Sequence, residues 1–354
     1  MEKINLAVIF GGVSSEHEVS RMSVTSVLTH LSKEKYEIYM LGITKAGKWL
    51  LYSGGIENIL DGSWEQDARN VPAVLSPDAE THGMIVLRDG SAETVRLDAV
   101  FPVLHGKNGE DGTIQGLMQL SGIPFVGCDT LSSAVCMDKA VSHTLLSAAN
   151  IEQAHYLWFY TSRYEQAADV ILNKIEARLD FPVFVKPANA GSSVGVSRVE
   201  NKEGLDAAIR KAAKEDKKIL VESGITGKEV ECAVMGNSNP TASIVGEIGA
   251  GAEFYDYDDK YVNGVSKQII PATISEEAAK TLQETAVRAY RLLGCTGLAR
   301  VDFFVTTDDK VILNEINTMP GFTSISMYPK LLMEMGMSYG EILDHLIDYA
   351  LERR

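Results

Sequence analysis

The 354-residue sequence contains few cysteines and no long apolar segment. Its cysteines are widely separated and form no CxxC pair, so we expect buried thiols rather than disulfide partners or zinc ligands (Cys128, Cys136, Cys232, Cys295). No apolar run approaches the roughly 20 residues that a transmembrane helix needs. The apolar run in the N-terminal MEKINLAVIFGG is too short for the hydrophobic region of a signal peptide, and no small-residue cleavage site follows it. These absences predict a cytoplasmic protein that does not enter membranes.

Basic residues are also scarce relative to acidic ones. The chain has 33 Lys and Arg against 48 Asp and Glu, which gives a net charge of −15. Nucleic-acid binding requires clustered basic side chains that neutralise phosphates, so a nucleic-acid partner is not expected. The 45% hydrophobic and 23% charged residues are ordinary for a globular protein, and the length allows two or three domains.

The N-terminal part alternates strand and helix patterns. INLAVIF (4–10) reads as a buried strand, followed by a helix over about 18–31 and a second strand at YEIYMLGIT (36–44). A polar, irregular stretch over about 53–95 precedes a third strand, LDAVFPVLHG (97–106). Strands that alternate with helices predict a parallel sheet with right-handed crossovers.

Changes of pattern divide the chain into three predicted domains. An N-terminal α/β domain covers 1–128 and a central domain covers 129–216, which is helix-rich over roughly 130–180 and then contains two strands within 183–199. From Lys217 to the C-terminus the short strands KILVES, KEVECAVMG and ASIVGEIG suit an antiparallel sheet in a third domain, 217–354. The fold class is therefore mixed, α/β and α+β.

The third domain carries further features. A polar, aromatic-rich segment over 250–268 is long for a loop inside a compact domain, and its glycines could act as hinges, so we expect a mobile loop. Amphipathic helices are predicted at 275–293 and 338–352. They flank the last predicted hairpin.

That hairpin, ARVDFFVTTDDKVILNEINTMPG, has two apolar strands around Asp308-Asp309, a plausible two-residue turn. Pairing outward from the turn sets three pairs of residues opposite each other (Thr307 and Lys310, Asp302 and Glu315, Arg300 and Asn317). Because side chains alternate along a strand, Arg300, Asp302, Glu315 and Asn317 should share one face.

Oxygen ligands without His or Cys are the hard donors that Mg²⁺ prefers. Opposed carboxylates destabilise a hairpin unless a cation lies between them, so this face is a candidate magnesium site. The alternative is a solvated strand face, and apolar Phe303, Ile312 and Ile316 on the other face fit both interpretations. The presence of Arg300 beside two carboxylates favours a site.

GITKAGKW (42–49) resembles a phosphate-binding P-loop up to its last position. That position requires Ser or Thr to hold magnesium, and Trp49 cannot. The segment also leads into the strand-like WLLY instead of a helix. A hairpin turn is the better interpretation.

Polar loops with glycines follow two of the predicted parallel strands, GGVSSEHEVS (11–20) and HGKNGEDGTIQG (105–116). Open α/β sheets bind ligands at this edge, so a shared cleft is expected, although the second loop could be a simple surface turn. VFVKPANAGSSVGVSRV places Lys186 beside a loop of small residues that could close over an anion. Lys139 and Lys260 are ordinary solvated lysines unless they converge with Lys186 on a polyphosphate.

Six motifs in order resemble the D-alanine–D-alanine ligase family of the ATP-grasp superfamily: GGxSxEHEVS, HGKNGEDGTIQG, the Met-Asp-Lys after GCDTLSSAVC, KPxxxGSSVGVS, ARVDFF and NEINTMPGFTSIS. The resemblance covers nearly the whole chain. It implies an ATP-grasp fold with an N-terminal Rossmann-like parallel sheet domain. The implied reaction joins two D-alanines through an acyl phosphate for peptidoglycan precursor synthesis, with ATP as co-substrate.

The resemblance also implies site residues. Lys139 and Lys186 bind the ATP phosphates, and Glu222 and Ile225 form the linker that binds adenine. Glu229 binds the ribose. The loop with Ser192 and Ser193 covers the nucleotide, and Lys260 also belongs to the ATP site. Two Mg²⁺ ions, which Mn²⁺ can replace, are held by three oxygen ligands (Asp302, Glu315, Asn317).

Substrate contacts follow from the same resemblance. Glu16 holds the ammonium of the first D-alanine beside His105, and Ser326 helps to hold the carboxylate of the second. Arg300 and the Gly321 amide stabilise the tetrahedral intermediate, and Tyr261 joins Glu16 and Ser192 in a hydrogen-bonded closure. A homodimer is implied as well.

Two departures from the family pattern are visible. Many relatives carry His where this chain has Ile325, and the KPANAGSS loop lacks the Arg-Glu pair common before GSS. D-Serine is an alternative second substrate, because residues around HGKNGEDGT and GCDTLSSAVCMDK also resemble the glycopeptide-resistance ligases. D-Lactate is disfavoured because Lys260 and Tyr261 are retained. A nucleotide-binding protein without activity is the third alternative, and the complete set of metal ligands argues against it.

Overall fold

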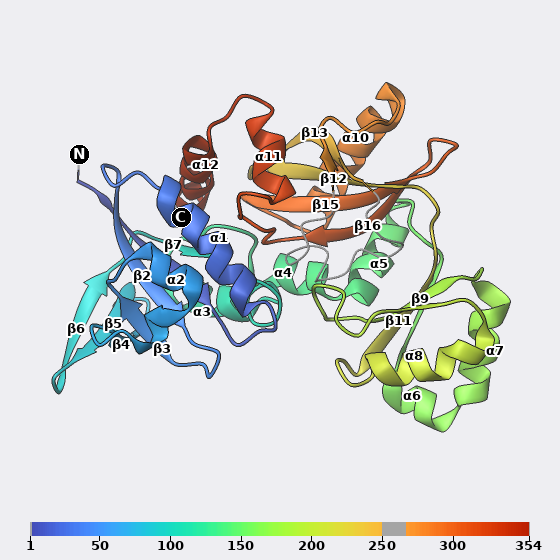
Figure 1. Cartoon of the computed structure of the whole chain (residues 1–354), viewed down its shortest axis with the longest axis horizontal. Coiled ribbons are helices and arrows are strands. Elements are labelled where there is room, and N and C mark those ends of the chain that lie inside the picture. The colour runs from blue at the N-terminus through green and yellow to red at the C-terminus, as the bar shows by residue number, and fades with distance from the viewer. Residues whose placement is uncertain (1, 250–266, 354) are drawn as a thin grey trace.

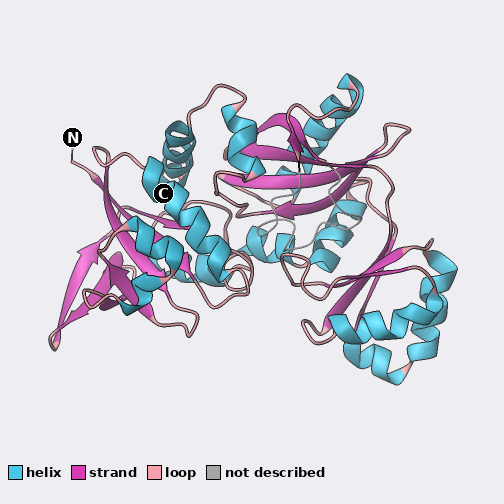
Figure 2. Ribbon diagram, viewed as in Figure 1, coloured by secondary structure: helices cyan, strands magenta, loops and turns pink. Residues whose placement is uncertain are grey.

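The computed structural model describes residues 2–249 and 267–353. Within them the strands form a seven-stranded, a four-stranded and a five-stranded sheet, each covered by helices (Figures 1 and 2). No helix in the described part of the chain is both long and apolar enough to span a bilayer. Lys260 and Tyr261, with most of the predicted 250–268 loop, lie outside the described residues.

The first sheet has the order β6-β5-β4-β3-β2-β1-β7. As predicted, β1 (Ile4–Gly11) pairs in parallel with β2 (Tyr36–Ile43) and β7 (Ala99–Pro102). The connecting helix α1 (His17–His30) and the later α3 (Thr113–Ser121) begin within the last residues of the two glycine-rich segments. Both loops therefore lie at one edge of the sheet.

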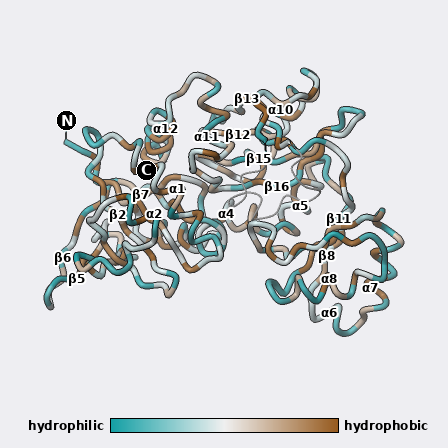
Figure 3. The backbone as a smooth tube through the Cα atoms, in the orientation of Figure 1, coloured by the Kyte–Doolittle hydropathy of each residue, from teal (hydrophilic) through white to brown (hydrophobic). Residues whose placement is uncertain are grey.

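The prediction of an irregular stretch over about 53–95 is wrong. After the hairpin partner β3 (Trp49–Tyr52) come two short helices and three antiparallel strands that extend the sheet (α2 Ile56–Asp61, η1 Ser63–Gln66, β4 Val71–Leu75, β5 Gly83–Arg88, β6 Ser91–Arg96). The β6 side chains are mostly exposed and polar, so no apolar alternation marks this edge strand (Figure 3). Asp89-Gly90, both with positive φ, forms the two-residue turn and was the available signal.

The hairpin interpretation of 42–49 is confirmed. β2 and β3 pair antiparallel across a turn in which Thr44 N donates to Lys48 O at 2.9 Å and Gly47 has φ +85°. Gly42 is required for packing, because a Cβ there would lie 2.3 Å from the ring of Trp64. Trp64 is fully buried against Phe10 and Tyr52, with ring centroids 4.8 and 6.1 Å away.

The second sheet has the order β10-β9-β11-β8 and is antiparallel throughout (β8 Tyr156–Tyr160, β9 Val183–Pro187, β10 Ser197–Val199, β11 Lys218–Ser223). Four helical segments accompany it (α6 Thr161–Gln166, α7 Ala168–Arg178, η2 Lys202–Gly204, α8 Leu205–Ala212). The sequence analysis grouped KILVES with the C-terminal strands, but as β11 it pairs with β8 and β9. Strand β8 within the helix-rich 130–180 was missed because pairing with β11 is non-local.

The third sheet, β14-β13-β12-β15-β16, is also antiparallel (β12 Lys228–Met235, β13 Thr241–Ile248, β14 Gln268–Ile269, β15 Leu298–Val305, β16 Val311–Asn317). The two predicted amphipathic helices are present as α10 (Glu276–Leu292) and α12 (Tyr339–Glu352). On one face α10 packs over a core that includes Cys232 and Phe303. The described residues form three further helices (α4 Thr130–Met137, α5 Lys139–Ala148, α11 Met327–Met333).

One hydrophobic core joins the first and third sheets. It contains residues of β1, α1, β12, α11 and α12, so the C-terminal helices attach the two sheets to each other (Figure 1). All four cysteines are buried free thiols, as expected. The Cys136 and Cys295 sulfurs lie 3.7 Å apart under α10.

Replacing Trp64 by alanine should lower the free energy of unfolding by about 3–5 kcal/mol, because it leaves a large cavity beside Gly42. Urea denaturation of the wild type and the variant measures this loss. Trp158→Ala is the control, since Trp158 is 43% exposed and its removal should cost about 1 kcal/mol or less. Equal losses in the two variants would contradict the assignment of Trp64 to the core.

Candidate active site

A pocket of about 740 Å³ is lined by strand residues of the second and third sheets and by residues that follow β1 and β7 of the first sheet. Fifteen of the seventeen predicted site residues line it, and the other two, Lys260 and Tyr261, lie outside the described residues. The lining set spans 314 positions of sequence, from Glu16 to Lys330. The predicted residues therefore converge in space.

The hairpin of β15 and β16 supplies the carboxylates. Asp302 lies opposite Glu315 and Arg300 opposite Asn317, as the spacing predicts. The predicted two-residue turn is wrong, because Thr306 N bonds to Lys310 O and Asp309 has φ +59°, which makes the turn one residue longer. A bulge next to Asp302 shifts the register back by one residue.

The bulge changes which side chains of β16 face the core. Phe303 and Ile316 belong to the buried core as expected. Ile312 is also buried but is not part of this core cluster: Leu313 takes that position, and Ile312 lines the pocket. The prediction for Ile312 failed because it assumed an unbroken alternation from the turn to Asn317.

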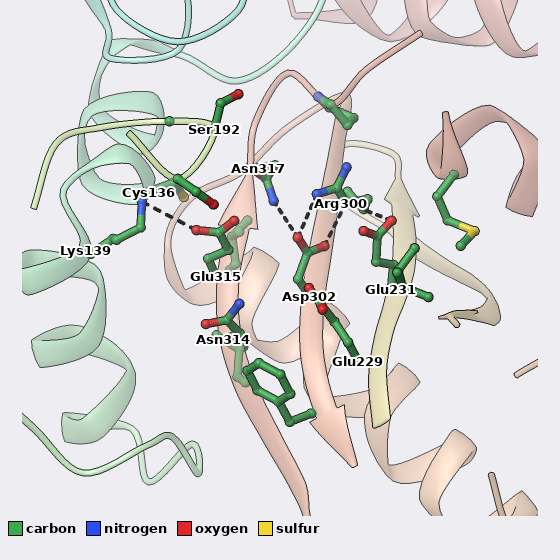
Figure 4. Close-up of a pocket in the computed structure, with 18 of the residues that line it drawn as sticks. Cys136, Lys139, Ser192, Glu229, Glu231, Arg300, Asp302, Asn314, Glu315 and Asn317 are labelled. Atoms are coloured by element: carbon green, nitrogen blue, oxygen red, sulfur yellow. Dashed lines mark hydrogen bonds and ion pairs between the residues drawn. The ribbon is translucent and has the colours of Figure 1, made fainter. Parts of the chain in front are cut away.

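Cationic and amide groups surround Asp302 (Figure 4). Arg300 donates from Nε to Oδ1 and from Nη2 to Oδ2, both at 2.7 Å, and Asn317 Nδ2 donates to Oδ2 at 2.9 Å. Arg300 Nε also lies 3.1 Å from an oxygen of buried Glu231 on β12. A charged, two-point contact of this kind orients both the guanidinium and the carboxylate.

Glu315 faces a lysine from another part of the chain. Lys139 Nζ lies 3.4 Å from Glu315 Oε2 and donates to Ala190 O at 3.0 Å. Lys139 is the first residue of α5, whose N-cap Asp138 accepts bonds from the backbone N–H groups of Ala140 and Val141. The N-cap of α5 thus fixes the backbone position from which the Lys139 side chain extends.

A second ion pair lines the same pocket. Lys186 on β9 donates to Glu222 on β11, a pair set by the antiparallel register of these strands. Burial alone would lower the pKa of Lys186, but the neighbouring Glu222, Glu315 and Glu229 raise it above its ordinary value. Lys186 is therefore a cation at neutral pH.

Buried His143 completes this group, and sequence reasoning missed it. Its Nε2 lies 3.7 Å from Glu222, and burial lowers the pKa of its imidazole. His143 follows Lys139 by four residues on α5, so the two side chains share a helix face. That spacing was the signal available in the sequence.

Glu16 connects the first sheet to the small-residue loop. Ser192 Oγ donates a hydrogen bond to Glu16 Oε1. A Cβ on Gly106 or Gly191 would lie 2.1 or 2.5 Å from Glu16 Oε2, so glycine at both positions makes room for the carboxylate. Ser192 has φ +46°, a left-handed conformation that costs energy for a non-glycine residue and marks a constrained loop.

His105 lies under Glu16 in a polar network. Its Nε2 is 2.9 Å from Ser23 Oγ, and its Nδ1 is 3.0 Å from Met319 O and 3.4 Å from Glu110 Oε1. Burial would lower the pKa of His105, but the contact with Glu110 and the charges of Glu110 and Glu16 raise it. Glu110 belongs to the HGKNGEDGTIQG loop and Ser23 lies three residues after GGVSSEHEVS, yet nothing local in the sequence marks either residue as a partner of a histidine.

The described pocket has an excess of negative charge. Eight carboxylates line it (Glu16, Glu110, Glu222, Glu229, Glu231, Glu247, Asp302, Glu315) against five basic residues (Lys139, Lys186, Lys228, Arg300, Lys330). In the described residues no three His, Cys, Asp or Glu side chains form a preformed metal site. Two opposed carboxylates with an amide are instead the oxygen donor set that suits Mg²⁺ shared with a phosphate.

Comparison with known proteins identifies close relatives of the chain. Family models described as D-ala D-ala ligase N-terminus and D-ala D-ala ligase C-terminus match residues 5–128 and 145–348. A D-alanine–D-alanine ligase of Caldicellulosiruptor bescii is 49% identical over 100% of this chain and 96% of its own length. One from Acetivibrio thermocellus is 49% identical over 99% and 97%.

Solved structures agree in fold. The VanG D-Ala:D-Ser ligase from Enterococcus faecalis superposes with a TM-score of 0.90 at 43% identity, covering 99% of this chain and 100% of that one. The D-alanine–D-alanine ligase from Coxiella burnetii gives a TM-score of 0.85 at 33% identity, covering 100% and 95%.

Glu110→Gln should lower the pKa of His105, because it removes the charge nearest to the imidazole. Protonated His105 stabilises the fold at pH values below its ordinary pKa of 6.5, and this contribution is lost as pH rises through the raised pKa. NMR titration of the imidazole measures the shift directly. Glu277→Gln, on the first turn of α10, is the control and should leave the titration unchanged. An unaltered His105 titration in Glu110→Gln would contradict the assigned coupling.

Proposed function

The chain belongs to the D-alanine–D-alanine ligase family, and we propose that it joins two D-alanines in the pocket between its three sheets. The product is D-alanyl-D-alanine for peptidoglycan precursors, and ATP is converted to ADP and phosphate. The observation that supports this most directly is the opposed pair Asp302 and Glu315, which faces lysines of the central region within one pocket. Cytoplasmic location and a homodimer are part of the proposal.

We propose that the chain has three domains with different roles, near 1–128, 129–216 and 217–354. Strand β11 pairs into the second sheet, so the structural border of the central domain extends to Ser223. Under this division the N-terminal domain supplies Glu16 and His105, and the other two domains hold the nucleotide between them.

ATP binding is assigned to the cleft between the second and third sheets. We propose that Lys139 and Lys186 contact phosphates, that Glu222 and Ile225 contact adenine and that Glu229 contacts the ribose; the support is that all five line the pocket. Ser193 belongs to the loop that covers the nucleotide, and Lys260 is proposed to contribute from outside the described residues. Fixed cations that meet a transferring phosphoryl group stabilise its developing charge.

Asp302, Glu315 and Asn317 would hold two Mg²⁺ ions, with Mn²⁺ as a substitute. Their oxygens are hard ligands on one face of the hairpin, and Asn317 directs its Nδ2 toward Asp302, which leaves its oxygen for another partner. When bound, the metal supplies positive charge to the phosphate oxygens.

The first chemical step is proposed to occur beside Glu16. Glu16 accepts the ammonium of the first D-alanine, and its position is fixed by Ser192 and the two glycines. A carboxylate oxygen of that D-alanine attacks the γ-phosphorus, the bond to the ADP oxygen breaks, and an acyl phosphate forms. Lys139 and Lys186 hold the transferred group in line.

The second step uses the Arg300 end of the pocket. The amine of the second D-alanine attacks the acyl carbon, a tetrahedral intermediate forms, and phosphate leaves with the C–O bonding electrons and takes up the proton that the nitrogen releases. Arg300 and the Gly321 amide are proposed to donate to the oxyanion, and Ser326 to the acceptor carboxylate. The loop carrying Ser192, with Tyr261 as its proposed partner, keeps water from hydrolysing the acyl phosphate.

D-Serine is the second candidate for the acceptor. The superposition with the D-Ala:D-Ser ligase at a TM-score of 0.90 favours this alternative. Ile325, at the position where many family members carry histidine, lines the pocket and is 48% exposed. A serine acceptor needs a polar partner for its hydroxyl group, and Ile325 offers none from its side chain.

Phosphate release in the presence of ATP, Mg²⁺ and D-alanine tests the proposal, and mass spectrometry identifies the product. We expect D-alanyl-D-alanine as the main dipeptide when D-alanine and D-serine are supplied at equal concentration. If D-alanyl-D-serine is the main product, the acceptor is D-serine and not D-alanine. Absence of both dipeptides would contradict the proposed reaction.

Glu315→Gln should reduce kcat by a factor of about 100 or more, because an amide is a much weaker ligand for a divalent cation and leaves phosphoryl charge unbalanced. The melting temperature should change little, since Glu315 is partly exposed. Glu284→Gln on the exposed face of α10 is the matched control. Activity close to the wild-type value over a range of Mg²⁺ concentrations would contradict the metal assignment.

A further inference from the structure

The five basic side chains that line the described pocket differ in their partners. Four form ion pairs: Lys139 with Glu315, Lys186 with Glu222, Lys228 with Glu247, and Arg300 with Asp302 and Glu231. Lys330 is the exception, since within the described residues no carboxylate lies within 4.0 Å of its ammonium group. An anion that enters the pocket would meet this charge without displacing a carboxylate of the described residues.

Lys330 is nevertheless held in a defined place. It lies on α11, four residues after the helix N-cap Ser326, so both side chains project from one side of the helix. Its Nζ donates to Gln268 Oε1 at 2.6 Å, and Gln268 Nε2 donates to Ile325 O at 2.7 Å. The two bonds connect the Lys330 ammonium to the segment that carries Ile325 and Ser326.

The environment of Lys330 is partly desolvated. Burial lowers the pKa of its ammonium group, and no neighbouring charge offsets that effect. A half-buried ammonium with one neutral hydrogen-bond acceptor is under-compensated, so a bound carboxylate would gain a strong charged contact there. Ser326, Arg300 and Lys330 all line the pocket, and Arg300 is already occupied by two carboxylates.

We propose that Lys330 binds the carboxylate of the acceptor amino acid and that Gln268 positions its ammonium for this contact. The inference rests on the proposed ligase function and adds a residue that selects acceptors bearing a carboxylate. The acceptor enters as an amine with a carboxylate on the adjacent carbon, so one anchored carboxylate also aims the amine toward the acyl carbon. Lys330 takes no part in phosphoryl transfer.

Two acceptors separate a charge contact from a general structural effect. D-Alaninamide has the same amine and methyl group as D-alanine but no carboxylate. We expect Lys330→Met to raise the KM for the D-alanine acceptor roughly 10- to 100-fold, the range for loss of one charged hydrogen bond. The KM for D-alaninamide should change less than about threefold, so the preference for D-alanine over its amide should collapse.

The donor half of the reaction is measured separately by trapping the acyl phosphate with hydroxylamine. Hydroxamate formation from ATP and D-alanine should be the same in the wild type and in Lys330→Met. Lys330→Arg should keep most of the acceptor preference, and Gln268→Leu should weaken it while the charge remains. Lys280→Met, at a side chain that is 77% exposed on α10, is the control and should change neither measurement.

Equal loss of both acceptors in Lys330→Met, or an unchanged KM for D-alanine, would overturn the role of Lys330. A parallel loss of hydroxamate formation would also overturn it, because the residue would then support the fold of the whole site. A wild type that forms neither hydroxamate nor dipeptide would overturn the proposed function itself. These outcomes are distinguishable in one set of assays.

Discussion

Repulsion between Asp302 and Glu315 is the constraint around which the pocket is arranged. Cross-strand partners have Cβ atoms only about 4.5–5.5 Å apart, so two carboxylates there destabilise the hairpin unless positive charge is supplied. Arg300 and Asn317 donate to Asp302 from the same hairpin, whereas Lys139 reaches Glu315 from α5. The charge balance of one strand pair thereby depends on a helix more than 160 positions away in the sequence.

The same dependence joins the N-terminal sheet to the site. Glu16 precedes α1, but its carboxylate accepts a hydrogen bond from Ser192 and fits only because Gly106 and Gly191 have no side chains. The C-terminal helices α11 and α12 fix the first sheet to the third through a shared core. A pocket lined by strands of the second and third sheets and by loops of the first is therefore a product of assembly, and no single domain contains it.

Sequence patterns were sufficient where the signal is local. The opposition of Asp302 to Glu315 could be predicted because two errors cancel: the turn is one residue longer than assumed, and the bulge restores the register. Ile312 lies between the turn and the bulge, where the predicted register is still wrong by one residue, and its side chain therefore lines the pocket. Non-local pairing was beyond reach, so β11 was grouped with the wrong sheet and polar β6 was missed. His143 needed only helix periodicity, but its partner Glu222 could come only from the fold.

Paired and unpaired cations imply different behaviour toward an anionic ligand. A phosphate that binds Lys139 or Lys186 must compete with Glu315 or Glu222, so its affinity depends on another cation taking over those carboxylates. This exchange couples divalent-cation binding to nucleotide binding through residues already in contact. An anion that binds Lys330 does not have to compete with a carboxylate of the described residues, since the hydrogen-bond acceptor of Lys330 is the neutral Gln268. Recognition of a carboxylate at that end can therefore proceed independently of the state of the phosphate end, as two successive steps in one pocket require.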